Sequence, residues 1–230
     1  MANLAIIPAR GGSKRIPRKN AKDFLGKPII AYSIEAALNS GLFNEVMVST
    51  DDHEIAAIAI RYGAKVPFFR SKKNADDFAT TLDVLKEVEA TYKEKMDRSF
   101  DFICCIYPTA PLVSVAKIQE GFELITIQNL DVVYPIVAFS YPLLRAVEVI
   151  DGITKMVWNQ FMNSRSQDLK TYYHDAGQWY WYNPSKINDS LFTDKTASII
   201  LSEEDIQDID TLSDWKIAEM KYKLRNVNIK

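Results

Sequence analysis

Residues 6–20 of this chain read IIPARGGSKRIPRKN. The start of this stretch completes an apolar run that begins at Leu4, and we expect that run to form a buried strand. The chain then changes abruptly to glycine and positive charge. Because Gly11 and Gly12 lack a Cβ atom, they can adopt positive φ and bring backbone N–H groups close to an anion. The loop also contains five cations: Arg10, Lys14, Arg15, Arg18 and Lys19. The pattern predicts a loop that binds a polyanion.

Two common phosphate-binding loops do not fit this stretch. A P-loop requires a glycine, four residues and then Gly-Lys-Ser/Thr, and the dinucleotide pattern requires Gly-x-Gly-x-x-Gly. Here the two glycines are adjacent, and Lys14 and Lys19 lie where neither pattern places a lysine. A solvated basic turn is the alternative interpretation of such a charge cluster. The buried strand directly before the loop favours phosphate binding.

The loop resembles the signature of a known family. Residues 7–14, IPARGGSK, and residues 16–20, IPRKN, are similar to the signature of the CMP-sialic acid synthetase family, cytidylyltransferases that make CMP-activated nine-carbon sugars. The resemblance implies that the loop wraps the triphosphate of CTP. Arg10 and Lys19 would neutralise the phosphates, and Asn20 would help to hold the nucleotide. The other nucleotide-binding positions that the resemblance implies in this loop are Ala9, Gly11, Gly12, Ser13 and Lys14.

Length and composition suit one large, or two closely joined, globular units. The chain has 230 residues, of which 47% are hydrophobic and 25% charged, with a formal net charge of −2. This balance argues against a nucleic-acid partner, which usually requires a wide basic surface. No apolar run approaches the about 20 residues that span a bilayer, and no signal-peptide pattern is present, so we expect a cytoplasmic protein without a membrane partner. The adjacent Cys104 and Cys105 are expected to be core thiols.

The first half of the chain alternates predicted strands with predicted helices. Strands are expected at 4–7, 45–49, 64–69 and 100–107, and helices at 28–40, 52–61 and 80–96. This rhythm predicts an α/β fold with a Rossmann-like, mainly parallel sheet covered by helices on both faces. Ligands are then expected at the carboxyl ends of the strands. The resemblance specifies the nucleotidyltransferase type of this three-layer α/β/α fold.

The second half of the chain has a different spacing. Apolar segments at 132–137 and 146–149 are too close for an intervening helix, which favours antiparallel pairing. Residues 141–182 are rich in aromatic side chains, which suit a core, an oligomer interface or a sugar platform. The resembled family uses this region as an arm that reaches a partner subunit, so a homodimer is expected. We divide the chain into a nucleotide-binding core (1–138), an antiparallel dimerisation and sugar-binding extension (139–182) and a return to the core with the last helix (183–230).

Asp208 and Asp210 form the second informative motif, in the sequence DIDT. In extended backbone, side chains two residues apart point to the same side, so the two carboxylates could grip one divalent cation. Asp210 could instead cap the last helix, and the residues alone do not choose between these roles. The matching Asp-x-Asp-Thr of the resembled family binds the catalytic metal. The resemblance therefore implies that Asp208 and Asp210 bind Mg²⁺ or Mn²⁺.

A base-binding group is expected between a predicted strand and a predicted helix. By themselves, Arg70, Asp77, Ala79 and Thr81 suit turn and helix-cap positions. The resemblance implies that Arg70, the backbone of Ala79 and the hydroxyl group of Thr81 recognise cytosine. Such a combination of donors and acceptors could distinguish cytosine from uracil.

Two segments carry the sugar-binding candidates. Residues 107–112, YPTAPL, correspond to a family motif that often begins with Gln and has Arg after Leu, where this chain has Tyr107 and Val113. That departure argues against sialic acid as the acceptor. Residues 165–168 and 173–178 resemble the subgroup that acts on pseudaminic acid, a bacterial diamino relative of sialic acid. The resulting candidates are Tyr107, Thr109, Arg165, Asp175 and Gln178.

The expected reaction is attack of the anomeric hydroxyl of a nine-carbon keto-sugar acid on the α-phosphorus of CTP, giving a CMP-sugar and pyrophosphate. Such a transfer depends on positioning and charge neutralisation, and the catalytic candidates are Arg10, Lys19, Asp208 and Asp210. Pseudaminic acid is the expected acceptor, with N-acetylneuraminate, legionaminate and ketodeoxyoctonate as alternatives. A catalytically silent nucleotide-binding module is the alternative from another class.

Overall fold

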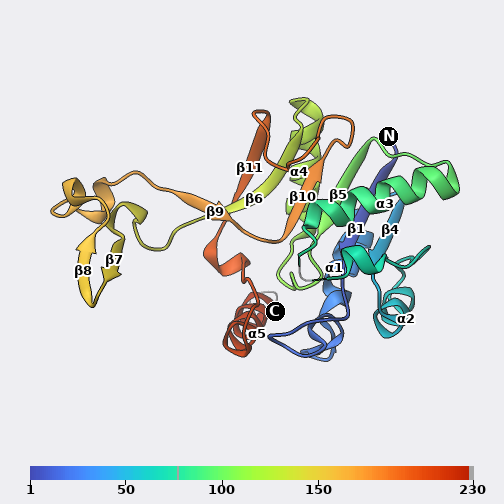
Figure 1. Cartoon of the computed structure of the whole chain (residues 1–230), viewed down its shortest axis with the longest axis horizontal. Helices are drawn as coiled ribbons and strands as arrows, with labels where there is room; N and C mark the ends of the chain where they lie inside the picture. Colours follow the sequence, from blue (N-terminus) through green and yellow to red (C-terminus); the bar gives the residue numbers. More distant parts are fainter. Residues whose placement is uncertain (77, 228–230) are drawn as a thin grey trace.

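The structure of the chain, a computed structural model, describes residues 1–76 and 78–227, so Asp77 lies outside the described residues. Within them, the central sheet has the strand order β11-β6-β10-β5-β1-β4, and β9 pairs with β6 (Figure 1). These strands are β1 (Asn3–Pro8), β4 (Glu45–Ser49), β5 (Phe102–Ile106), β6 (Val132–Ala138), β9 (Tyr173–Asp175), β10 (Trp179–Tyr182) and β11 (Thr196–Leu201). Only β9 and β10 of this sheet run against the other strands, so the predicted mainly parallel α/β fold is confirmed.

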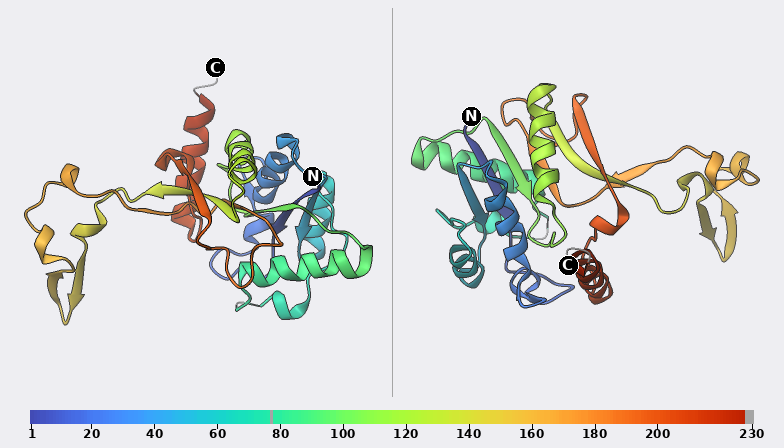
Figure 2. Two further views of the ribbon diagram at one scale, coloured as in Figure 1. Left: turned by 90° about the horizontal axis from the view of Figure 1, so that it is seen from above. Right: turned by 180° about the vertical axis from the view of Figure 1, so that it is seen from behind.

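Helices cover both faces of the sheet (Figure 2). They are α1 (Ile29–Ser40), α2 (His53–Arg61), α3 (Thr81–Met96) and α4 (Val115–Ile127). α1, α2 and α4 pack on one face, and α3 packs on the other. Neighbouring residues of β5 point to opposite faces of the sheet. Cys104 packs in the core with α1, α2 and α4, and Cys105 packs in the core with α3. Both thiols are free and buried, as the sequence predicts.

Local sequence signals set the limits of these helices. Gly41 follows α1 in the left-handed conformation, with a φ of 67° that glycine adopts without a steric penalty. Asp52 caps α2 by accepting a hydrogen bond of 3.0 Å from the backbone N–H of Ile55. Thr80 and Asp83 form a capping box at the start of α3. The predicted starts of α2 and α3 are therefore confirmed within one residue.

Two predicted features are wrong, and α4 is absent from the predicted helices. At 64–69 only Lys65 forms an isolated bridge, with Met47, and the nearby Pro67 has no N–H to extend a ladder. The strand near 146–149 does not pair with β6. It is β7 (Val147–Ile150), which pairs with β8 (Ile153–Met156). Gly121 lies within α4 and lowers the helix propensity of that segment. Glycine is needed there because a Cβ would lie 2.5 Å from the ring of Trp179.

Residues 139–172 project away from the sheet as an arm (Figure 1). The arm contains the β7–β8 hairpin, and apolar side chains such as Val149 and Ile153 are exposed on it. Part of the aromatic segment does not belong to the arm, because β9 and β10 return to the central sheet and the side chains of β10 are buried. The short 3₁₀ helices of the chain are η1 (Lys19–Ala21), η2 (Lys72–Asn74), η3 (Leu143–Arg145), η4 (Asn159–Phe161), η5 (Ser166–Asp168) and η6 (Glu203–Asp205).

A small third core joins the N-terminal loop to the end of the chain. The last helix, α5 (Leu212–Val227), buries Trp215 and Ala218 against Ile16 of the loop and against the segment with β2 (Asp23–Phe24) and β3 (Lys27–Pro28). Ile209, between the two aspartates, is fully buried in the same core. Packing of apolar side chains therefore brings the cationic loop next to Asp208 and Asp210. Among the described residues, none of the helices is long and apolar enough to cross a membrane.

Candidate active site

The loop after β1 and the turn after β5 enclose a cleft of ≈ 450 Å³ at the carboxyl ends of these strands. This is the edge of the sheet where ligands of α/β proteins bind. A smaller hollow of ≈ 210 Å³ shares Pro8, Arg10 and Tyr107 with the cleft. The cleft is lined by Pro8, Arg10, Ser13, Lys14, Arg15, Ile16, Lys19, Asn20, Tyr107, Pro108, Thr109 and Asp208.

Lys19 connects the cationic loop to the acidic motif. Its Nζ donates a hydrogen bond of 2.7 Å to the carbonyl oxygen of Ile209 and lies 3.9 Å from Oδ1 of Asp210. Oδ2 of Asp210 is 2.6 Å from Nη1 of Arg15. Burial lowers the pKa of Lys19, and the negative charges of Asp210 and Asp208 oppose that shift. The loop and the acidic pair thus form one charged site, although they are far apart in the sequence.

The acidic pair suits a hard divalent cation. Partial desolvation and the neighbouring charge of Asp210 raise the pKa of the Asp208 carboxyl group, so a cation would offset the unfavourable negative charge at this residue. Asp210 does not cap α5, because Thr211 and Asp214 do so: Oγ1 of Thr211 accepts from the N–H of Asp214 at 3.2 Å, and Oδ2 of Asp214 accepts from the N–H of Thr211 at 2.7 Å. Among the described residues, no group of three or more His, Cys, Asp or Glu could hold a metal, so a cation here would need oxygen ligands from a substrate as well.

We expect Asp208→Asn to raise the melting temperature of the metal-free chain at pH 7. A carboxyl group whose pKa is raised by folding stabilises the fold below its unfolded pKa and loses this contribution as pH rises through the folded value. Charged Asp208 therefore costs stability at neutral pH, and asparagine avoids this cost. Thermal unfolding of both proteins from about pH 4 to about pH 8 measures the effect. The gain should shrink toward acid pH, and a lower melting temperature of the variant at pH 7 would contradict this assignment.

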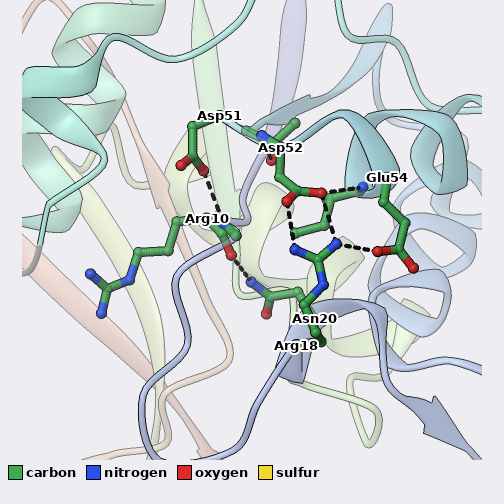
Figure 3. A network of polar contacts seen from close by, with 9 residues as sticks. Arg10, Arg18, Asn20, Asp51, Asp52 and Glu54 are labelled. Carbon is green, nitrogen blue, oxygen red and sulfur yellow. Dashed lines mark hydrogen bonds and ion pairs between the residues drawn. The ribbon is translucent and has the colours of Figure 1, made fainter.

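The two glycines of the loop can adopt positive φ, but neither does so in the structure. Gly11 is required for another reason: a Cβ there would lie 2.9 Å from Cβ of Asp52. Its N–H donates to Oδ1 of Asp51 at 2.9 Å (Figure 3). Asn20 is buried and closes the base of the loop, since its Nδ2 donates to the carbonyl oxygen of Arg10 at 2.9 Å. The left-handed residue of the loop is Arg18, with a φ of 55°.

The predicted base-binding residues gather around the smaller hollow. Arg70 is buried and donates to Oγ of Ser49 at 3.1 Å and to its carbonyl oxygen at 2.6 Å. Burial lowers the pKa of Arg70 to about 10, which still leaves the guanidinium charged at neutral pH. Ala79 and Thr81 line the same hollow, and Oγ1 of Thr81 lies 3.1 Å from the hydroxyl oxygen of Tyr107.

The structure brings only some of the sugar-binding candidates to the cleft. Tyr107 and Thr109 line it. The buried side chain of Gln178 instead donates to the carbonyl oxygen of Asp205 at 2.7 Å. Asp175 accepts from the N–H of Gly177 at 2.8 Å and from the hydroxyl group of Tyr180, and it does not line the cleft.

Arg165 lies in the arm, away from the cleft of its own chain, and pairs with Asp168 at 2.7 Å. Residues that the sequence analysis missed include Asp51 and Asp52, which contact the loop from the turn after β4. Their signal is a pair of carboxylates one residue beyond the end of a strand, at the carboxyl edge of a parallel sheet.

Comparisons with known proteins agree with this geometry. A family model described as "Cytidylyltransferase" matches residues 4–206. Pseudaminic acid cytidylyltransferase of Campylobacter jejuni (serotype O:2) is 41% identical over 98% of both chains. CMP-N,N'-diacetyllegionaminic acid synthase of Legionella pneumophila is 34% identical over 97% of both. A solved CMP:2-keto-3-deoxy-manno-octonic acid synthetase complexed with CTP shares the fold, with a TM-score of 0.70 at 18% identity over 98% of this chain and 100% of that one. The resemblance found in the loop is therefore confirmed, and the chain belongs to the cytidylyltransferase family.

Proposed function

We propose that this cytidylyltransferase couples CTP to pseudaminic acid and releases pyrophosphate. The observation that favours pseudaminic acid as the acceptor is the 41% identity, over nearly the whole length, to a pseudaminic acid cytidylyltransferase. The relative that makes CMP-N,N'-diacetyllegionaminic acid is less similar, at 34% identity. Tyr107 and Val113, which replace the Gln and Arg of the sialic acid motif, also favour a different acceptor.

The cleft residues have distinct roles in this proposal. Arg10 and Lys19 bind the triphosphate and neutralise the charge that develops on the leaving pyrophosphate. The smaller hollow holds the cytosine base of CTP next to Arg70 and Thr81. The acceptor then enters beside Thr109, where its anomeric hydroxyl can attack the α-phosphorus in line. These groups act by position and charge, without a covalent intermediate on the protein.

Asp208 and Asp210 would hold Mg²⁺ or Mn²⁺, which neutralises phosphate charge and polarises the α-phosphate. Arg15 pairs with Oδ2 of Asp210, so a cation at this carboxylate would compete with the guanidinium of Arg15 for its negative charge. Dialysis against EDTA should remove activity, and added Mg²⁺ should restore it. A turnover rate that EDTA leaves unchanged would exclude this role for the acidic pair.

A homodimer is proposed from the arm. The apolar side chains of its hairpin, Val147, Val149, Ile150 and Ile153, are more than half exposed in the single chain. Apolar surface of this kind is typical of an interface. Arg165 lies in the arm and could reach the cleft of a second copy. Light scattering should give the mass of a dimer at micromolar concentration, and a monomer there would contradict the proposal.

The acceptor is tested by measuring CTP-dependent pyrophosphate release with a panel of purified sugar acids. Pseudaminic acid should give a kcat/KM at least about tenfold above those of legionaminate, N-acetylneuraminate and ketodeoxyoctonate, which corresponds to about 1.4 kcal/mol of discrimination. A higher value for any of the other three would replace the proposed acceptor. Binding of CTP without pyrophosphate release from any sugar would instead indicate a silent nucleotide-binding module.

A further inference from the structure

Carboxylates from the turn after β4 and from the start of α2 form hydrogen bonds with the loop (Figure 3). Asp51 accepts a hydrogen bond from the N–H of Gly11 at 2.9 Å. Asp52 accepts two from the guanidinium of Arg18, at 2.5 Å from Nη1 and 2.9 Å from Nη2. Glu54 accepts another from Nη2 of Arg18. None of these four side-chain partners, Arg18 included, lines the cleft.

Asp52 is the centre of this network. Its Oδ1 also accepts from the N–H of Ile55 at 3.0 Å, so one carboxylate both caps α2 and binds the loop. The hydrogen bonds from Arg18 hold the pKa of Asp52 at about 2, which keeps the carboxylate charged at every physiological pH. Gly11 packs so closely on Asp52 that an added Cβ would lie 2.7 Å from its Oδ2. The loop is therefore fitted closely to the turn after β4.

The network holds the loop at two points, Gly11 and Arg18, which enclose residues 12–17. Each point is the chain neighbour of a cleft cation: Gly11 follows Arg10, and Arg18 precedes Lys19. Arg18 has left-handed backbone, which is sterically unfavourable for a residue other than glycine, so its surroundings must stabilise this conformation. The pairing with Asp52 and Glu54 supplies charge-assisted bonds at that residue.

We propose that Asp52 and Arg18 are positioning residues for the triphosphate: they fix the loop so that Arg10 and Lys19 face the cleft, and they do not touch the substrate themselves. This inference rests on the proposed function of the loop. Arg18 then has a role different from that of the cleft cations, because its guanidinium pairs with Asp52, which caps α2, and with Glu54 in the first turn of α2. A loop that is ordered before CTP arrives loses less conformational entropy on binding, which lowers the KM for CTP.

The test compares Asp52→Ser, Arg18→Asn and the double variant. Serine is also a good helix cap and asparagine tolerates left-handed backbone, so both variants retain the local structure while the ion pair is lost. Each single variant should raise the KM for CTP about tenfold, with kcat changed less than about twofold, since charge-assisted bonds typically contribute at this level. The double variant should be no worse than Arg18→Asn, because that change already removes the contact between Arg18 and Asp52. Arg18→Lys should recover part of the affinity.

The control is Glu120→Gln, which breaks the exposed pair of Glu120 with Lys117 at 2.6 Å on α4, far along the chain from the loop. It should leave KM and kcat unchanged. Additive effects in the double variant would mean that Arg18 binds phosphate directly, and an unchanged KM in the single variants would mean that the network does not position the loop. Either result overturns the inference. CTP binding by calorimetry tests it independently of the sugar, so a wild-type chain that binds CTP but releases no pyrophosphate contradicts only the proposed function.

Discussion

Asp210→Asn should reduce cytidylyl transfer at least about a thousandfold while the chain remains folded. The substitution removes one of the two carboxylates proposed to hold the divalent cation, and it also removes the negative charge that faces Lys19 and Arg15. Both changes weaken the site where charge develops on the phosphates. Activity with saturating CTP and Mg²⁺ is the measurement, and residual activity within about tenfold of wild type would contradict the assigned role.

The fold should survive this change because the start of α5 does not depend on the side chain of Asp210. Thr211 and Asp214 form the cap, and the buried Ile209 and Trp215 anchor the segment. Asp205→Asn is the matched control. Its carboxylate lies 3.9 Å from Arg225, outside the cleft lining, and its loss should leave the rate unchanged. Similar far-ultraviolet circular dichroism spectra of the two variants would show that a difference in their rates reflects a lost catalytic group and not a lost fold.

Lys19→Met should lower kcat/KM for CTP about a hundredfold, or about 2.7 kcal/mol. The ammonium group is proposed to bind the triphosphate, and it also joins the loop to the carbonyl oxygen of Ile209 at 2.7 Å. Methionine keeps the apolar stem and removes the charge. Steady-state kinetics with CTP as the varied substrate measures the loss.

Lys22→Met is the control for this prediction. Lys22 belongs to the same basic segment, but its Nζ lies 5.7 Å from the ring centre of Trp215 and it does not line the cleft. Its loss should change kcat/KM less than about twofold. Equal losses in the two variants would mean that only the general positive charge of the loop matters, which contradicts a specific role for Lys19.

Local signals in the sequence predict much of the fold. The β1 strand, Gly41 after α1, the Asp52 cap and the Thr80 cap each follow from residues close in the chain. Predictions fail where distant contacts decide. Gly121 disfavours a helix by propensity, yet α4 forms and buries Ile118 and Ile125 in the core, and the ring of Trp179 from β10 fills the space that a side chain at 121 would need. The apolar residues at 64–69 read as a strand, but this segment makes only one bridge beside β4.

In the candidate site, too, local signals predict some features and distant contacts decide the others. The charge pattern predicts the phosphate-binding loop, and the spacing of Asp208 and Asp210 predicts a pair of oxygen ligands. The proximity of the loop to these aspartates depends on the third core around Ile16, Ile209 and Trp215, which no local signal reveals. Sequence resemblance predicts Arg165 and Asp175 as sugar-binding residues, but it carries no information on whether both can reach the cleft of one chain. The sequence likewise does not predict that the left-handed residue of the loop is Arg18 and neither glycine, because Arg18 contacts Asp52 in the turn after β4, which is distant in the sequence.

A crystal structure with CTP and Mn²⁺, using anomalous scattering to locate the metal, tests the central claim most directly. We predict a manganese peak at the carboxylates of Asp208 and Asp210, with the triphosphate lying between them and the side chains of Arg10 and Lys19. A triphosphate bound outside the cleft, or a metal that contacts neither aspartate, would contradict the account.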